Sequence, residues 1–246
     1  MGNRNSRPAA LACWLALAAA LPAAAAEPSP STLLRLDGRL VKWGVPAHGA
    51  PARVTYAFLD APRDRPDARN CRSMRDLEGL LRANTIPPDA FAEEVRAAFA
   101  VWSSAAGLRF VESDDPAHAD ILIGAQSGSD GTAFTDVIED RRAPGPIAPL
   151  RSAAICLDPT VRWELAVDRD PKTFNVRYVV AHEIGHAIGL DHAGRARGLM
   201  GFAYLERLRA AAEVRLGPVD IEAVTALYGP PQPVVADGLA QTPAPE

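Results

Sequence analysis

Three histidines and a glutamate stand close together where the sequence reads HEIGHAIGLDH, at residues 182–192. On an α-helix, a spacing of four residues puts His182 and His186 on the same face, one turn apart. Both imidazoles can then reach one Zn²⁺ at the usual Zn–N distance of about 2.0–2.1 Å. Gly189 can adopt positive φ at little cost, so the helix can end there and the chain can turn His192 toward the same ion.

Glu183 stands directly after the first of these histidines. Three nitrogen ligands leave a fourth tetrahedral position open, which is the arrangement of a catalytic zinc site. Glu183 can take a proton from a water molecule that the metal polarises, and can then pass it to a departing amine. The residues therefore indicate hydrolysis of a peptide bond without a covalent intermediate, with Glu183 as the catalytic base.

Three other interpretations are weighed against this one. A chance match to the pattern is expected on the order of 10⁻⁵ times in a chain of this composition, so ordinary helix histidines are a poor explanation. A catalytically inactive zinc-binding module that is secreted for interaction would have no need of the carboxylate of Glu183. An enzyme restricted to small substrates, such as an aminopeptidase, is not separated from an endopeptidase by these residues.

Several regular segments must position the site. Apolar residues recur at helical spacing from Phe91 to Trp102, and proline precedes the last helical segment. We predict helices at 88–106, 175–190 and 218–228. We predict strands at 53–60, 108–111, 119–124 and 153–158, with a long irregular segment at 125–152. These elements predict an α+β domain with a twisted mixed sheet of about five strands, three helices, and a zinc cleft between the sheet and the C-terminal helix.

The first 26 residues have the features of a signal peptide. Arg4 and Arg7 precede an apolar run at 9–21, and small residues at 23–26 offer a cleavage site. The run is shorter than the roughly 20 residues that cross a bilayer, so we expect no membrane anchor after cleavage. The protein is expected to be secreted or periplasmic, where Cys71 and Cys156 can form a disulfide or remain two buried thiols.

Composition and charge argue against a nucleic-acid-binding protein. The chain has 246 residues and a formal net charge of −4, with no basic run, so a nucleic-acid partner is not expected. After the signal peptide we predict a short N-terminal extension at 27–42, one domain at 43–230, and a flexible proline-rich tail at 231–246. We expect a monomer.

The sequence resembles the matrixins, the group of metzincin zinc endopeptidases that contains the matrix metalloproteinases. HEIGHAIGLDH is followed by Gly198-Leu199-Met200, which is similar to the zinc helix and methionine turn of that group. Weaker matches are the segments 119–121 and 227–229. The resemblance implies a metzincin fold, one catalytic zinc, a protein or peptide substrate, and Met200 as a hydrophobic floor beneath the metal.

The sequence also departs from that group. Outside the zinc helix it has only His48 and His118, so we expect no second, structural zinc. Calcium could bind acidic residues in the loops, although such residues are usually just solvated. The candidate calcium ligands are Asp130, Asp136, Asp140 and Asp158. No cysteine stands in a propeptide position, and we expect an enzyme without that latency device.

The residues that select a substrate are harder to identify. In the resembling group, a segment after the methionine turn forms a wall of the pocket beside the zinc. Here that segment is 201–217, and its helix formers at 205–216 predict a helical wall or simply a helix that covers the core. Tyr204 could help to hold an oxyanion, but its spacing from Met200 does not match that of other metzincins.

Overall fold

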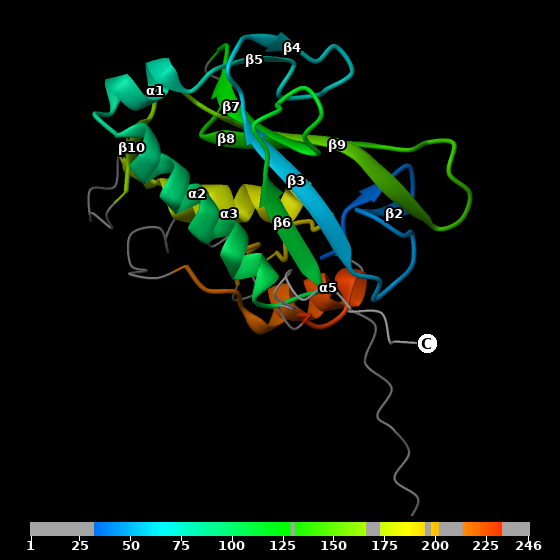
Figure 1. Cartoon of the computed structure of the whole chain (residues 1–246). Coiled ribbons are helices and arrows are strands. Elements are labelled where there is room, and N and C mark those ends of the chain that lie inside the picture. The colour runs from blue at the N-terminus through cyan, green and yellow to red at the C-terminus, as the bar shows by residue number, and fades with distance from the viewer. Residues whose placement is uncertain (1–31, 129–130, 166–172, 195–197, 202–213, 233–246) are drawn as a thin grey trace, which may run out of the picture.

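The computed structural model describes residues 32–128, 131–165, 173–194, 198–201 and 214–232 (Figure 1). Several predictions concern residues outside this part of the chain. They are the signal peptide at 1–26, the ligand candidate Asp130, the oxyanion candidate Tyr204, most of the segment 201–217, and nearly all of the tail at 231–246.

The sheet is mixed, as the sequence predicts. Its five longest strands lie in the order β6-β3-β7-β9-β8. Their bounds are β3 Ala52–Phe58, β6 Leu108–Glu112, β7 Ile121–Gln126, β8 Ala133–Glu139 and β9 Ile147–Leu157. Neighbours pair in parallel except β8, which is antiparallel to β9. In the described part of the chain, β9 is the only strand that pairs with β8. Residues of β8 also line the cleft that contains the three histidines.

Short strands extend this sheet beyond the prediction. They are β1 Arg35–Leu36, β2 Arg39–Lys42, β4 Arg63–Asp64 and β5 Ser73–Arg75. A separate parallel pair consists of β10 Arg162–Glu164 and β11 Thr173–Asn175. Strand β2 pairs in parallel with the start of β9, so the end of the predicted extension packs onto the sheet.

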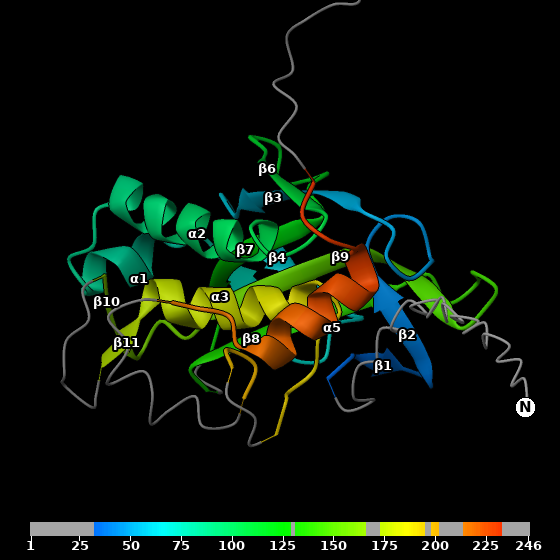
Figure 2. The same ribbon diagram turned by 90° about the horizontal axis from the view of Figure 1, so that it is seen from below.

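The helices follow the prediction closely. Their bounds are α1 Glu78–Ala83, α2 Pro88–Ser103, α3 Val176–Ala187 and α5 Pro218–Tyr228. Among the helices of the described residues, only α1 was not expected. Helices α2 and α3 lie side by side along the sheet, and α5 crosses below the end of α3 (Figures 1 and 2). The indole of Trp102 on α2 is fully buried and donates to the carbonyl of Ala181 on α3 over 2.8 Å, which fastens the two helices together.

The prediction of an irregular segment at 125–152 is wrong. This stretch contains all of β8 and the first half of β9. The first half of β9 includes Pro149 and Arg151, and it becomes a strand because β2 and β8 supply its partners. Within β8, Asp136 resembles a turn residue in sequence but is buried. Tertiary contacts therefore decide the structure where the local pattern is polar.

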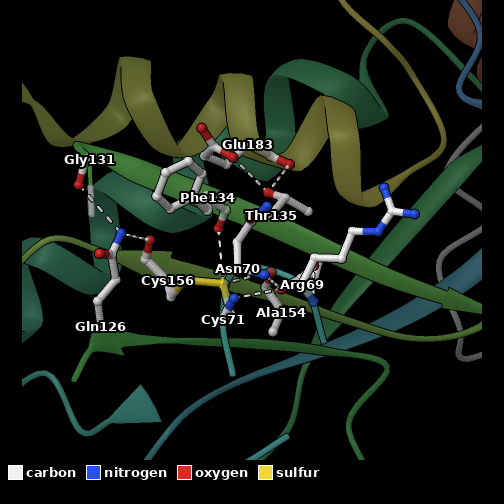
Figure 3. The surroundings of a disulfide bond; sticks show 11 residues. Arg69, Asn70, Cys71, Gln126, Gly131, Phe134, Thr135, Ala154, Cys156 and Glu183 are labelled. Carbon is white, nitrogen blue, oxygen red and sulfur yellow. Dashed lines mark hydrogen bonds between the residues drawn. A yellow bond between two sulfur atoms is a disulfide. The ribbon is translucent and has the colours of Figure 1, made fainter. Parts of the chain in front are cut away.

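The segment before β5 is fastened to the sheet twice. Cys71 and Cys156 form a disulfide, which joins this segment to β9 (Figure 3). The carboxylate of Asp136 on β8 accepts hydrogen bonds from the backbone N–H groups of Arg69, Asn70 and Cys71, at 3.0, 2.8 and 2.5 Å. Three charge-assisted bonds explain how this carboxylate can be buried.

We expect the double substitution Cys71→Ser/Cys156→Ser to lower the free energy of unfolding by about 2–5 kcal/mol. The bond closes a loop between residues separated by 85 positions, so its loss restores much freedom to the unfolded chain. Denaturant titration measures the change, and added reductant should destabilise the wild type but leave the double variant unaffected. An equal midpoint for wild type and variant would show that the bond contributes nothing.

Candidate metal centre

Helix α3 presents the first two histidines. The side chain of Asn175 caps its start by accepting from the N–H of Tyr178, and the helix ends at Ala187. Gly189 then adopts a φ of 92°, as the sequence predicts, and redirects the chain toward His192. The backbone carbonyl of Val41 lies so close to Gly189 that a Cβ atom would collide with it. Glycine is therefore required here both for its conformation and for the close approach of β2.

The three histidines come together in space. Their possible ligand atoms all lie within 4.8 Å of one another, and His182 is buried while His186 and His192 are partly exposed. Nδ1 of His182 lies 2.7 Å from the carbonyl of Leu199, and Nδ1 of His186 lies 2.9 Å from that of Leu190. Because a carbonyl can only accept, both Nδ1 atoms carry the hydrogen. Both Nε2 atoms therefore present lone pairs.

The donor set fits zinc. Nε2 of His182 lies 3.3 Å from Nε2 of His192. Two nitrogen ligands of a tetrahedral zinc ion, each at about 2.0–2.1 Å, are themselves separated by about 3.3 Å. Within the described residues, no other group of three or more His, Cys, Asp and Glu side chains converges in this way.

Burial sets the protonation of the site. It lowers the pKa of His182 to about 3 and that of His186 to about 4, and the pKa of His192 is also lowered, chiefly by burial. These imidazoles are therefore neutral at pH 7, which is the form that binds a metal. Burial raises the pKa of Glu183 to about 7, against the opposing effect of a hydrogen bond from Thr135. A carboxyl with a pKa near neutrality is suited to accept and return a proton.

Thr135 on β8 is a neighbour of Glu183 that the sequence analysis missed. Its hydroxyl lies 2.7 Å from Oε2 of Glu183 and 3.0 Å from the backbone carbonyl of the same residue (Figure 3). Residue type and spacing gave no signal for this contact, because it joins β8, which was not predicted, to the middle of α3.

Met200 lies beneath the helix that carries the histidines. It is 1% exposed and packs against Gly185, where a Cβ atom would collide with its sulfur. The turn around it is held by Asp220 of α5, whose carboxylate accepts from the N–H groups of Leu199 and Met200. The carbonyl of Leu199 in turn orients His182, so this turn supports the site directly.

A cleft of about 440 Å³ opens over these residues. The histidines and Glu183 form one side of it, and Phe134 and Thr135 of β8 form another. Leu34 also borders the cleft, because its N–H donates to the carbonyl of Gly189 over 2.9 Å. Among the described residues, α5 contributes nothing to the lining, so this helix supports the methionine turn instead of forming a wall of the cleft.

The described residues proposed for calcium, Asp136, Asp140 and Asp158, belong to no group of three or more converging ligand side chains. Asp136 accepts from three backbone N–H groups, Asp140 accepts from the N–H of Arg142, and Asp158 accepts from Thr160. Each carboxylate therefore has protein donors, and calcium binding stays a prediction. No helix in the described ranges has the length and apolar character needed to cross a membrane.

Comparison with known proteins agrees with the site. The sequence model of the matrixin family matches residues 80–229. The chain is similar to human matrix metalloproteinase-19, with 33% identity over 160 residues, which are 63% of this chain and 29% of that protein. It is 32% identical to metalloendoproteinase 1-MMP of Arabidopsis thaliana over 154 residues, or 60% of this chain and 40% of the relative. Karilysin of Tannerella forsythia is 28% identical over 142 residues, or 56% and 28%. Each match spans less than half of the relative's length.

Proposed function

Because this chain belongs to the matrixin family of zinc metalloendopeptidases, we propose that it is a zinc-dependent endopeptidase that cleaves proteins or peptides. The observation that carries the proposal is the convergence of three neutral imidazoles beside the buried carboxylate of Glu183. We also propose that the signal peptide at 1–26 exports it to the periplasm or the medium, and that it acts as a monomer.

Each residue has a role in this proposal. His182, His186 and His192 would hold the zinc, which when bound supplies a Lewis acid that polarises water and a substrate carbonyl. Glu183 holds the proton that the attacking water gives up, and returns it to the leaving amine. Met200 supports the turn on which His182 depends, and Gly189 allows the change of direction that brings in His192.

The edge of β8 indicates how a substrate could lie. Its backbone borders the cleft beside Glu183, and an extended peptide can pair with such an edge as an added strand. Main-chain bonds of this kind suit an endopeptidase, because they hold the substrate chain on both sides of the cleaved bond.

Calcium binding at Asp136, Asp140 or Asp158 is a secondary proposal, and it does not depend on the geometry of the zinc site.

Incubation of the purified protein with a peptide library tests this function. We expect cleavage at internal bonds, loss of cleavage with the chelator 1,10-phenanthroline, and recovery when Zn²⁺ is added back. Release of single N-terminal residues would instead indicate an aminopeptidase. Retention of one zinc per chain without any cleavage would indicate an inactive zinc-binding module, and either result would contradict the proposal.

A further inference from the structure

One side-chain contact joins the sheet to the predicted catalytic residue. The hydroxyl of Thr135 lies within hydrogen-bond distance of both the carboxylate and the backbone carbonyl of Glu183, at 2.7 and 3.0 Å. The hydroxyl has one hydrogen, which it shares between these two acceptors of the same residue, and the shorter contact is to the carboxylate. Figure 3 shows this arrangement, with Thr135 reaching from β8 to α3.

A flexible glutamate side chain needs a hydrogen bond of this kind to keep one orientation. Holding a free glutamate in one rotamer costs conformational entropy, and the cost is among the larger ones for side chains. In the described residues, the carboxylate of Glu183 is buried and Thr135 is the side chain that bonds to it. A carboxylate that must reach a water molecule beside three histidines gains from being held before the reaction begins.

The position of Thr135 is itself fixed. It pairs with Ile155 in the antiparallel ladder between β8 and β9. The next residue, Asp136, binds the backbone of the segment 69–71, which the disulfide joins to β9. The strand that carries the hydroxyl is therefore held both by its pairing with β9 and by the side-chain bonds of Asp136, and it can act as a rigid support for a residue on the helix.

We propose that Thr135 is a positioning residue that holds the carboxylate of Glu183 in its working orientation. The proposal rests on the proposed function, because it assigns to Thr135 a role in the same reaction. It differs from a packing role, in which only the shape of the side chain would matter.

Substitution separates these two roles. Thr135→Val keeps the branched shape and removes the hydroxyl, whereas Thr135→Ser keeps the hydroxyl and removes the methyl group. Thr225→Val serves as a matched control, because its hydroxyl donates to the carbonyl of Ala105 at 3.4 Å and Thr225 does not line the cleft. For each variant we would measure kcat, KM, zinc content, melting temperature, and the position of Glu183 in crystals of the metal-free protein.

We expect Thr135→Val to lower kcat by about 10–100-fold, which is part of the 10²–10⁴-fold that a positioned base contributes. KM should change by less than about threefold, because an interaction made in the transition state affects kcat. Zinc should stay near one per chain. Thr135→Ser should recover most of the activity, and Thr225→Val should match the wild type. In metal-free crystals, Glu183 should move in Thr135→Val and stay in place in Thr135→Ser.

Several results would overturn the proposal. They are an unmoved Glu183 in Thr135→Val, a kcat within twofold of the wild type, an equal loss in Thr135→Ser, or an effect on KM alone. A wild-type protein that cleaves no peptide would contradict the proposed function, and the position of Glu183 in the metal-free crystals would then still decide the role of Thr135.

Discussion

Glu183→Gln should lower kcat by about 10²–10⁴-fold while the protein keeps about one zinc per chain. Glutamine has nearly the same shape and can still accept the hydrogen bond of Thr135 through its amide oxygen, so the local structure should survive. It cannot take up the proton of the attacking water, and that step loses its base. Steady-state kinetics on a cleaved peptide, with metal analysis of the same sample, measures both quantities.

Glu222→Gln is a suitable control for the loss of a carboxylate, because this residue is exposed on α5. It should leave kcat and melting temperature unchanged. Normal turnover in Glu183→Gln would show that another group is the base. Loss of zinc together with activity would instead place Glu183 among the groups that hold the metal.

The second large effect is expected on metal binding. His192→Ala should weaken zinc affinity by more than about 100-fold, because even residues that only orient a zinc ligand contribute about 10–100-fold. His182 and His186 would remain on one turn of α3, but the imidazole whose Nε2 lies 3.3 Å from that of His182 would be gone. Competition with a chromophoric chelator measures the affinity directly and requires no substrate.

His48→Ala provides the matched control, because His48 is exposed and its Nδ1 lies near the carbonyl of Ala226, away from the cleft. Its zinc affinity should equal that of the wild type. Unchanged affinity in His192→Ala would mean that the third ligand lies elsewhere in the chain, and the geometry of the centre would have to be interpreted again.

The sequence predicts the helices well because their signals are local. The proline at the start of α5 and the apolar stripe of α2 act within one or two turns, and the predicted bounds 218–228 agree with the structure. Helix α2 ends at Ser103, before the predicted 106. The zinc motif is also local, since its three histidines lie on one helix and the turn that follows it.

The missed features are those that depend on distant parts of the chain. Strand β8 contains Asp136, whose burial is possible only because three N–H groups from the segment 69–71 meet it. Thr135 gains its role from the same strand. The bonds from the N–H groups of Leu199 and Met200 to Asp220 could not be predicted from residue spacing. The pairing of Cys71 with Cys156, which the sequence left open, needed geometry to decide it.

The disulfide has a further consequence for the proposed endopeptidase, because such an enzyme can meet copies of itself. Residues 71 and 156 enclose a long stretch of chain that includes α1, α2 and four of the five longest strands in whole or in part. If self-digestion cut the backbone once anywhere within that stretch, the two pieces would still be joined through sulfur. A nicked molecule could therefore keep its parts together, and autolysis there would become visible only after reduction.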